Sequence, residues 1–261
     1  MNQTYEQLYI VSQLVLKDLL LFFRGFWNKF IDLIIMISLN VFVFSYFMPG
    51  LAVDYGTFIL VGAIASFGFF QIAHKVGTLV ADIDGDRTIN SKLILPVNTW
   101  TIFCSQALAW ALESSIINIL LFPLGKILLF SRFNLSGIAY GRLFLMIITS
   151  NLFFGFFALW ITSMLKGGMR SLTHLWVRFI SPMYMLGCYF YSWETAYKLS
   201  PIIGYISLLN PFVYVMEGTR SAVLGPQGLL PFWFSFGALV LFTTVFAIHA
   251  ISRLKRRLDC V

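Results

Sequence analysis

Residues 181–220 decide how the chain is interpreted, and they read SPMYMLGCYFYSWETAYKLSPIIGYISLLNPFVYVMEGTR. The stretch is mostly apolar, yet it carries charges at Glu194 and Lys198 and closes on Glu217 and Arg220. Residues that interrupt helices recur along it: Gly187, Pro201, Gly204, Asn210 and Pro211. A loop in water would be less apolar, and a spanning helix would contain fewer breakers. The pattern is typical of backbone that enters a bilayer without crossing it, where protein or a wet cavity satisfies its polar groups.

The composition places this stretch in a membrane protein. Of 261 residues, 59% are hydrophobic and only 11% are charged, whereas soluble domains have roughly 45–50% apolar and about 25% charged residues. The net charge of +7 comes from Lys and Arg that lie beside apolar blocks, which favours a topological role over nucleic-acid binding. The first twenty residues lack the features of a cleavable signal peptide, so we expect them to stay in the mature protein.

The hydrophobic periodicity predicts an all-α membrane domain over residues 1–261. Residues 4–28 have apolar side chains at helical spacing, but Lys17 and Asp18 stand near the middle. Two charges are costly in hydrocarbon, so we expect an amphipathic helix in the membrane interface rather than a first span. Six blocks of about 20 residues are long enough to span: 30–48, 57–76, 100–123, 140–163, 172–191 and 231–252.

The distribution of Lys and Arg predicts the orientation of these spans. Twelve fall in segments on the side of the termini: Lys17, Arg24, Lys29, Lys75, Arg87, Lys92, Lys166, Arg170, Arg253, Lys255, Arg256 and Arg257. Five fall on the opposite side: Lys126, Arg132, Arg142, Lys198 and Arg220. Because positive charge is enriched in cytoplasmic segments, both termini are expected in the cytoplasm.

The connection over residues 77–99 contains alternating acids at Asp82, Asp84 and Asp86. A calcium loop that begins at Asp82 would need Gly at its sixth position and Glu at its twelfth, where the chain has Arg87 and Leu93. The calcium interpretation therefore fails. A membrane-embedded, metal-dependent transferase using the Asp82–Arg87 cluster stays an alternative, although no further acid follows to hold its metals before the next span.

The same connection has the pattern of a short amphipathic helix. Ile89, Leu93 and Ile94 share one face, and Pro96 ends the run. Such a helix between two spans would dock in a groove of a soluble partner; the alternative is an ordinary solvated loop.

Two charged residues fall inside predicted spans, Glu113 and Arg178. Intramembrane charges face protein or water and are functional candidates by default. The alternatives are a structural pair for Glu113 and an Arg178 that reaches the interface. No nucleotide-binding loop, catalytic constellation or metal site is apparent in the sequence, so energy for any transport would have to come from another chain.

The last part of the opening stretch resembles a family signature. Residues 209–220, LNPFVYVMEGTR, are similar to the Asn-Pro…Tyr…Glu-Gly-x-Arg pattern that precedes the last helix of ABC-2 transporter permeases. Thr88 and Ile89, followed by Leu93 and Pro96, resemble the family's coupling region, Gly-Thr-Leu-Glu…Leu…Pro. Here Arg87 replaces the glycine and Asn90 the acid.

The resemblance implies the membrane subunit of an ATP-driven exporter of drugs, lipids or polysaccharides, without enzymatic activity or a cofactor of its own. It implies a permease homodimer in a bacterial inner membrane and a cytoplasmic ABC ATPase that carries ATP and Mg. Residues expected to couple to this ATPase are Asp82, Asp84, Arg87, Thr88, Ile89, Leu93 and Pro96. Within an outer region that includes the re-entrant segment 192–230, the expected gate residues are Gly187, Asn210, Pro211, Tyr214, Glu217 and Arg220. A membrane scaffold without transport activity is the third possibility.

Overall fold

The computed structural model describes residues 3–47, 55–85, 88–95, 97–165 and 173–259. Every regular element in these ranges is helical, which confirms the predicted all-α class. The first elements are α1 (Gln3–Arg24), α2 (Phe26–Phe42), η1 (Val43–Phe47), α3 (Tyr55–Ala65), α4 (Phe67–Asp84), α5 (Ile89–Leu93), α6 (Thr99–Leu129), η2 (Phe130–Arg132) and α7 (Tyr140–Met164). The remaining elements are η3 (Trp176–Ile180), α9 (Ser181–Met185), α10 (Trp193–Leu199), α11 (Pro201–Ser207), α12 (Pro211–Val223) and α13 (Phe232–Asp259).

Five stretches of the described chain are long and apolar enough to cross a membrane: Phe26–Phe47, Tyr55–Ile83, Thr99–Leu129, Tyr140–Met164 and Phe232–Arg257. They match five of the six predicted blocks and identify a multi-pass membrane protein. The block predicted at 172–191 is different. Its described part is helical from residue 173 to residue 185, including η3 and α9, and then turns; residue 172 lies outside the described residues. A sixth span therefore stays a prediction.

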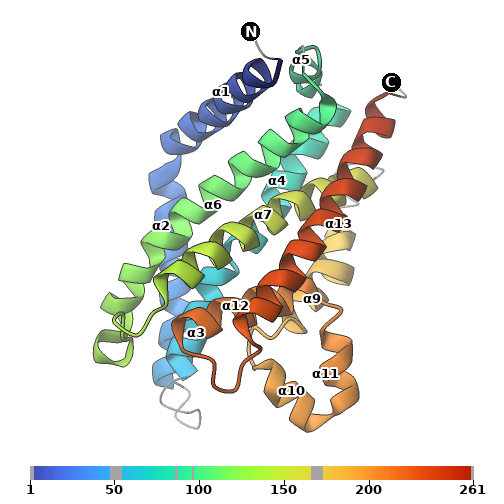
Figure 1. Cartoon of the computed structure of the whole chain (residues 1–261). Helices are drawn as coiled ribbons and strands as arrows, with labels where there is room; N and C mark the ends of the chain where they lie inside the picture. The colour runs from blue at the N-terminus through green and yellow to red at the C-terminus, as the bar shows by residue number, and fades with distance from the viewer. Residues whose placement is uncertain (1–2, 48–54, 86–87, 96, 166–172, 260–261) are drawn as a thin grey trace.

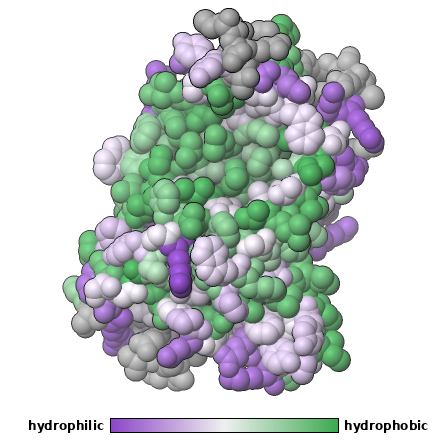
Figure 2. All heavy atoms as spheres, viewed as in Figure 1, coloured by the Kyte–Doolittle hydropathy of each residue, from purple (hydrophilic) through white to green (hydrophobic). Residues whose placement is uncertain are grey.

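The helices form an elongated bundle whose two ends differ (Figure 1). The N-terminus, the C-terminus and α5 lie at one end, called the terminal end below. The start of α3, together with α10 and α11, lies at the other, called the distal end. Figure 2 shows hydrophobic side chains over much of the middle of one face and hydrophilic side chains mainly toward the ends. This distribution is the one that a bilayer requires.

Helix α7 forms the centre of the bundle because it packs against α4, α6, α12 and α13. Its core face is rich in aromatic rings, and Phe153 and Phe157 have no exposed surface. A β-carbon on Gly155 would lie only 2.7 Å from the Ala107 carbonyl oxygen, so glycine is what lets α6 and α7 approach this closely.

Helix α1 runs beside α6 and connects to α2 through Gly25 (Figure 1). It buries Val15 and Phe22, while Leu8, Leu16 and Leu20 are exposed. An exposed apolar face is consistent with contact with lipid, and the interfacial position of residues 4–28 stays a prediction.

Candidate functional site

Arg220 is the centre of a buried cluster at the distal end. It lies on α12 and has no exposed surface. Its Nε donates to the Phe58 carbonyl at 3.2 Å, and its two terminal nitrogens donate to the carbonyls of Cys188 and Tyr189. The guanidinium carbon also lies 3.4 Å from the centre of the Phe58 ring. Because a buried cation needs compensation, these contacts fix α12 against α3 and the segment after α9.

Glu217 lies one turn earlier on α12 and is also fully buried. One carboxylate oxygen accepts from the Trp193 N–H at 3.0 Å, and the other accepts from the Leu230 N–H at 2.9 Å. Glu217 therefore joins the start of α10 to the segment that leads into α13. Both Glu217 and Arg220 lie in the described chain, and no ion pair within 4 Å joins them.

Asn210 and Pro211 form the turn into α12. The side-chain oxygen of Asn210 accepts from the Phe212 N–H at 3.0 Å, and its side-chain nitrogen donates to the Met183 backbone carbonyl at 2.7 Å. Pro211 follows as the first residue of the helix, where its missing N–H costs nothing. The side chain of Asn210 thus caps α12 and ties it to α9.

Two other predicted gate residues belong to the same cluster. The Tyr214 hydroxyl donates to the Leu208 carbonyl at 2.7 Å. Gly187 lies against the Phe212 ring and the Met183 carbonyl oxygen, with no room for a β-carbon. All six residues predicted for the outer gate are therefore brought together, and the gating role stays a prediction.

Residues that the sequence did not single out complete the cluster. A β-carbon on Gly62, in α3, would lie 2.5 Å from a terminal nitrogen of Arg220. Trp193 donates its indole N–H to the Gly204 carbonyl at 2.9 Å, which closes the turn between α10 and α11. An apolar block does not reveal which of its residues face a buried cation, so Gly62 had no detectable signal.

At the terminal end, Asp82 stabilises the start of α5. One of its oxygens accepts from the Thr88 N–H at 2.8 Å and from the Thr88 hydroxyl. The other accepts from the Ile89 N–H at 2.8 Å. Asp82 is thus a cap supplied from the end of α4, which the sequence did not indicate.

Other side chains attach α5 to the bundle. Ile89 is buried, and Leu93 packs partly against the core. Lys92 donates to Gln106 on α6 at 2.8 Å and lies 3.5 Å from an oxygen of Asp18 on α1. The predicted coupling residues Arg87 and Pro96, and the side chain of Asp84, lie outside the described residues. The short helix predicted after residue 88 is present, while its contact with an ATPase stays a prediction.

The transferase alternative stays untested, because Asp86, Arg87 and the side chain of Asp84 lie outside the described residues. No three His, Cys, Asp or Glu side chains among the described residues are placed to hold a metal ion. Both oxygens of Asp82 are already used by N–H donors of the chain.

Glu113 has a partner that the sequence did not suggest. Lys75 on α4 is only 8% exposed, donates to the Trp110 carbonyl at 2.9 Å, and lies 3.9 Å from a Glu113 oxygen. The structural pair considered for Glu113 is thus present. Arg178, in contrast, is exposed on η3 and belongs to neither cluster.

The two clusters stand at opposite ends of one bundle: a short capped helix at the terminal end, and a hydrogen-bonded group of short helices at the distal end.

No model of a known protein family matches the chain, and no curated protein matches it significantly in sequence.

Proposed function

We propose that the chain is the membrane subunit of an ATP-driven exporter of the ABC-2 type. It would act as a homodimer in a bacterial inner membrane and bind a cytoplasmic ABC ATPase that supplies ATP hydrolysis. The substrate would be an amphiphile: a lipid, a glycolipid or polysaccharide, or a drug. In this proposal six spans place both termini in the cytoplasm, and residues 172–191 supply the fifth.

The proposal rests on the hydrogen bonds that the signature residues Asn210, Glu217 and Arg220 make. Each of them bonds to the backbone of neighbouring segments. Asn210 bonds to Met183, and Glu217 bonds to Trp193 and Leu230. Arg220 bonds to Phe58, Cys188 and Tyr189. A pattern that merely recurred by chance would not be expected to place its polar members at three such junctions. The arrangement supports a distal unit of short helices that moves as one piece.

The terminal end supports the other half of the proposal. Ile94, immediately after α5, is 83% exposed, although α5 itself is capped and anchored. A rigidly held helix with a protruding apolar side chain has the properties needed to fit a groove on a soluble partner.

The experiment is co-purification with an ABC ATPase co-expressed from the same genome. Ile94→Glu should abolish the association, because it introduces a charge into the proposed groove. Leu199→Glu is the matched control, since Leu199 is 81% exposed but lies at the distal end. Stable protein that never recruits an ATPase, or equal effects of both variants, would contradict the proposal.

A further inference from the structure

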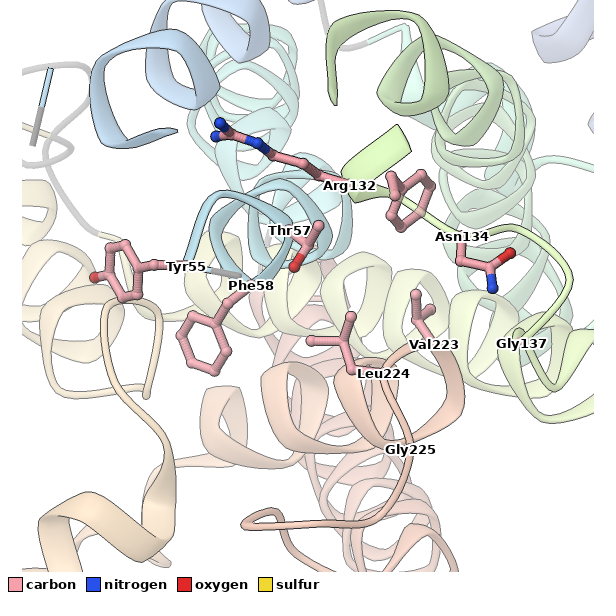
Figure 3. A pocket seen from close by; sticks show the side chains of 10 residues that line it. Tyr55, Thr57, Phe58, Arg132, Asn134, Gly137, Val223, Leu224 and Gly225 are labelled. Carbon is pink, nitrogen blue, oxygen red and sulfur yellow. The ribbon is translucent and has the colours of Figure 1, made fainter. Parts of the chain in front are cut away.

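A pocket of about 560 Å³ opens at the distal end (Figure 3). It forms where α3 begins, where α6 passes through η2 into the following loop, and where α12 ends. Tyr55, Phe58, Phe133 and Leu224 provide apolar wall. Its volume lies within the range of roughly 300–1,000 Å³ that small-molecule sites occupy.

The position of the pocket along the bundle sets its depth in a membrane. Tyr55 is the first residue of one candidate span, and Leu129 is the last residue of another. Arg132, on the rim, lies just beyond that second span, whereas Phe58 lies one turn inside the first. The pocket therefore extends from the level of the headgroups to that of the acyl chains.

Arg132 supplies the positive charge of the pocket. The Arg132 guanidinium lies 5.3 Å from the centre of the Tyr46 ring, and no carboxylate of the described chain lies within 4 Å of it. The side-chain oxygen of Asn134 accepts from the N–H and the hydroxyl of Ser136, at 3.0 and 2.7 Å. Figure 3 shows Asn134 and the Arg132 guanidinium extending toward opposite sides of the pocket, so Asn134 is not placed beside the cation. A cation beside an apolar wall suits an anion that carries a hydrocarbon chain.

We propose that this pocket binds an anionic phospholipid of the membrane. The phosphate would contact Arg132, and one acyl chain would lie along Phe58, Phe133 and Leu224. This proposal requires only that the chain is embedded in a membrane, so it stands or falls independently of export.

The chain offers matched variants for the test. Arg132→Gln removes the cation, and Arg142→Gln is its control, because Arg142 is at the same end but lies over Phe232 and does not line the pocket. Gly137→Leu fills the pocket, since a β-carbon there meets nothing within 4 Å. Gly141→Leu is its control, because Gly141 has the same free space outside the pocket.

The measurement is binding of fluorescently labelled phosphatidylglycerol to the purified full-length protein in phosphatidylcholine nanodiscs. We expect saturable binding that unlabelled phosphatidylglycerol displaces and phosphatidylcholine does not. Arg132→Gln should weaken it about tenfold or more, as expected for one lost charge-assisted contact. Gly137→Leu should also weaken it, and both controls should bind like the unaltered protein.

Three results would overturn the proposal. Equal affinity for the two lipids, or equal effects of the variants and their controls, would remove the assignment to this pocket. Full displacement by inorganic phosphate alone would show a site for a soluble anion. Loss of dimers with Gly137→Leu, without loss of lipid binding, would show that a second copy of the chain covers the pocket.

Discussion

Replacing Gly62 by alanine tests the packing of the distal cluster most directly. The new β-carbon would lie 2.5 Å from a terminal nitrogen of Arg220 and 3.5 Å from the Tyr189 ring. The guanidinium must therefore retreat by about 1 Å to reach the 3.4 Å of ordinary van der Waals contact. That movement is opposed by its hydrogen bonds to the carbonyls of Cys188 and Tyr189.

The magnitude follows from these contacts. Losing one hydrogen bond to a buried charged group costs about 1.5–3 kcal/mol. Alanine is favoured over glycine inside a helix by about 1 kcal/mol, which offsets part of the loss. The expected net destabilisation is about 0.5–2 kcal/mol, and the melting temperature should fall by about 1–8 °C for a chain of this size.

Thermal unfolding of the purified protein in detergent, followed by tryptophan fluorescence, is a suitable assay. Gly237→Ala on α13 is the control, because a β-carbon there meets nothing within 4 Å. It should leave the melting temperature unchanged or raise it slightly. If Gly62→Ala and Gly237→Ala have the same melting temperature, the Arg220 guanidinium is not confined by its hydrogen bonds to Cys188 and Tyr189.

Three further predictions concern the rest of the chain. Asp82→Ala should speed amide hydrogen exchange at Thr88 and Ile89, because it removes both acceptor oxygens. The melting temperature should fall by no more than a few degrees, because a cap contributes about 1 kcal/mol; unchanged exchange at both amides would exclude the capping role. Lys75→Met should destabilise the protein more than Lys75→Met combined with Glu113→Gln, because the single change leaves a partly buried carboxylate without its partner; additive effects in the same melting assay would argue against coupling of the pair. The predicted topology can be tested with single cysteines in a cysteine-free variant. Arg253→Cys should react with impermeant maleimide only from the cytoplasmic side, and Leu199→Cys only from the outside. Labelling of both positions from one side would contradict six spans.

The sequence allowed the helical class and five of the spans to be predicted, because hydrophobic blocks of sufficient length have few other structures available. The ends of the apolar blocks were predicted less accurately. The block predicted at 57–76 is described as Tyr55–Ile83, with a turn at Ser66 between α3 and α4. Lys75 was therefore counted among surface cations although it is buried. A lysine near the end of an apolar block looks interfacial until its partners on another helix are known.

Arg220 shows why the candidate site was only partly predictable. The sequence marked it as a signature residue, yet it was also counted among the cations of the outer side. Its compensation comes from carbonyls 162 residues away at Phe58 and about 30 residues away at Cys188 and Tyr189. Backbone carbonyls carry no residue identity, so a sequence pattern does not reveal them. Removing Lys75 and Arg220 from the charge count lowers both sides by one and leaves the predicted orientation unchanged.

The way in which Arg220 is held has a consequence for the conditions under which the distal end can work. Its partners are peptide carbonyls and an aromatic ring, which neither gain nor lose protons in the physiological range. Exposed ion pairs weaken as salt screens them, whereas a fully buried joint of this kind is shielded from mobile ions. The joint between α3, α12 and the segment after α9 should therefore hold with the same strength in acidic, neutral, dilute or saline surroundings, whereas burial lowers the pKa of Arg220 to about 10 and sets an alkaline limit. In the predicted orientation the distal end faces the outside of the cell, where such tolerance is an advantage that a surface salt bridge would not provide.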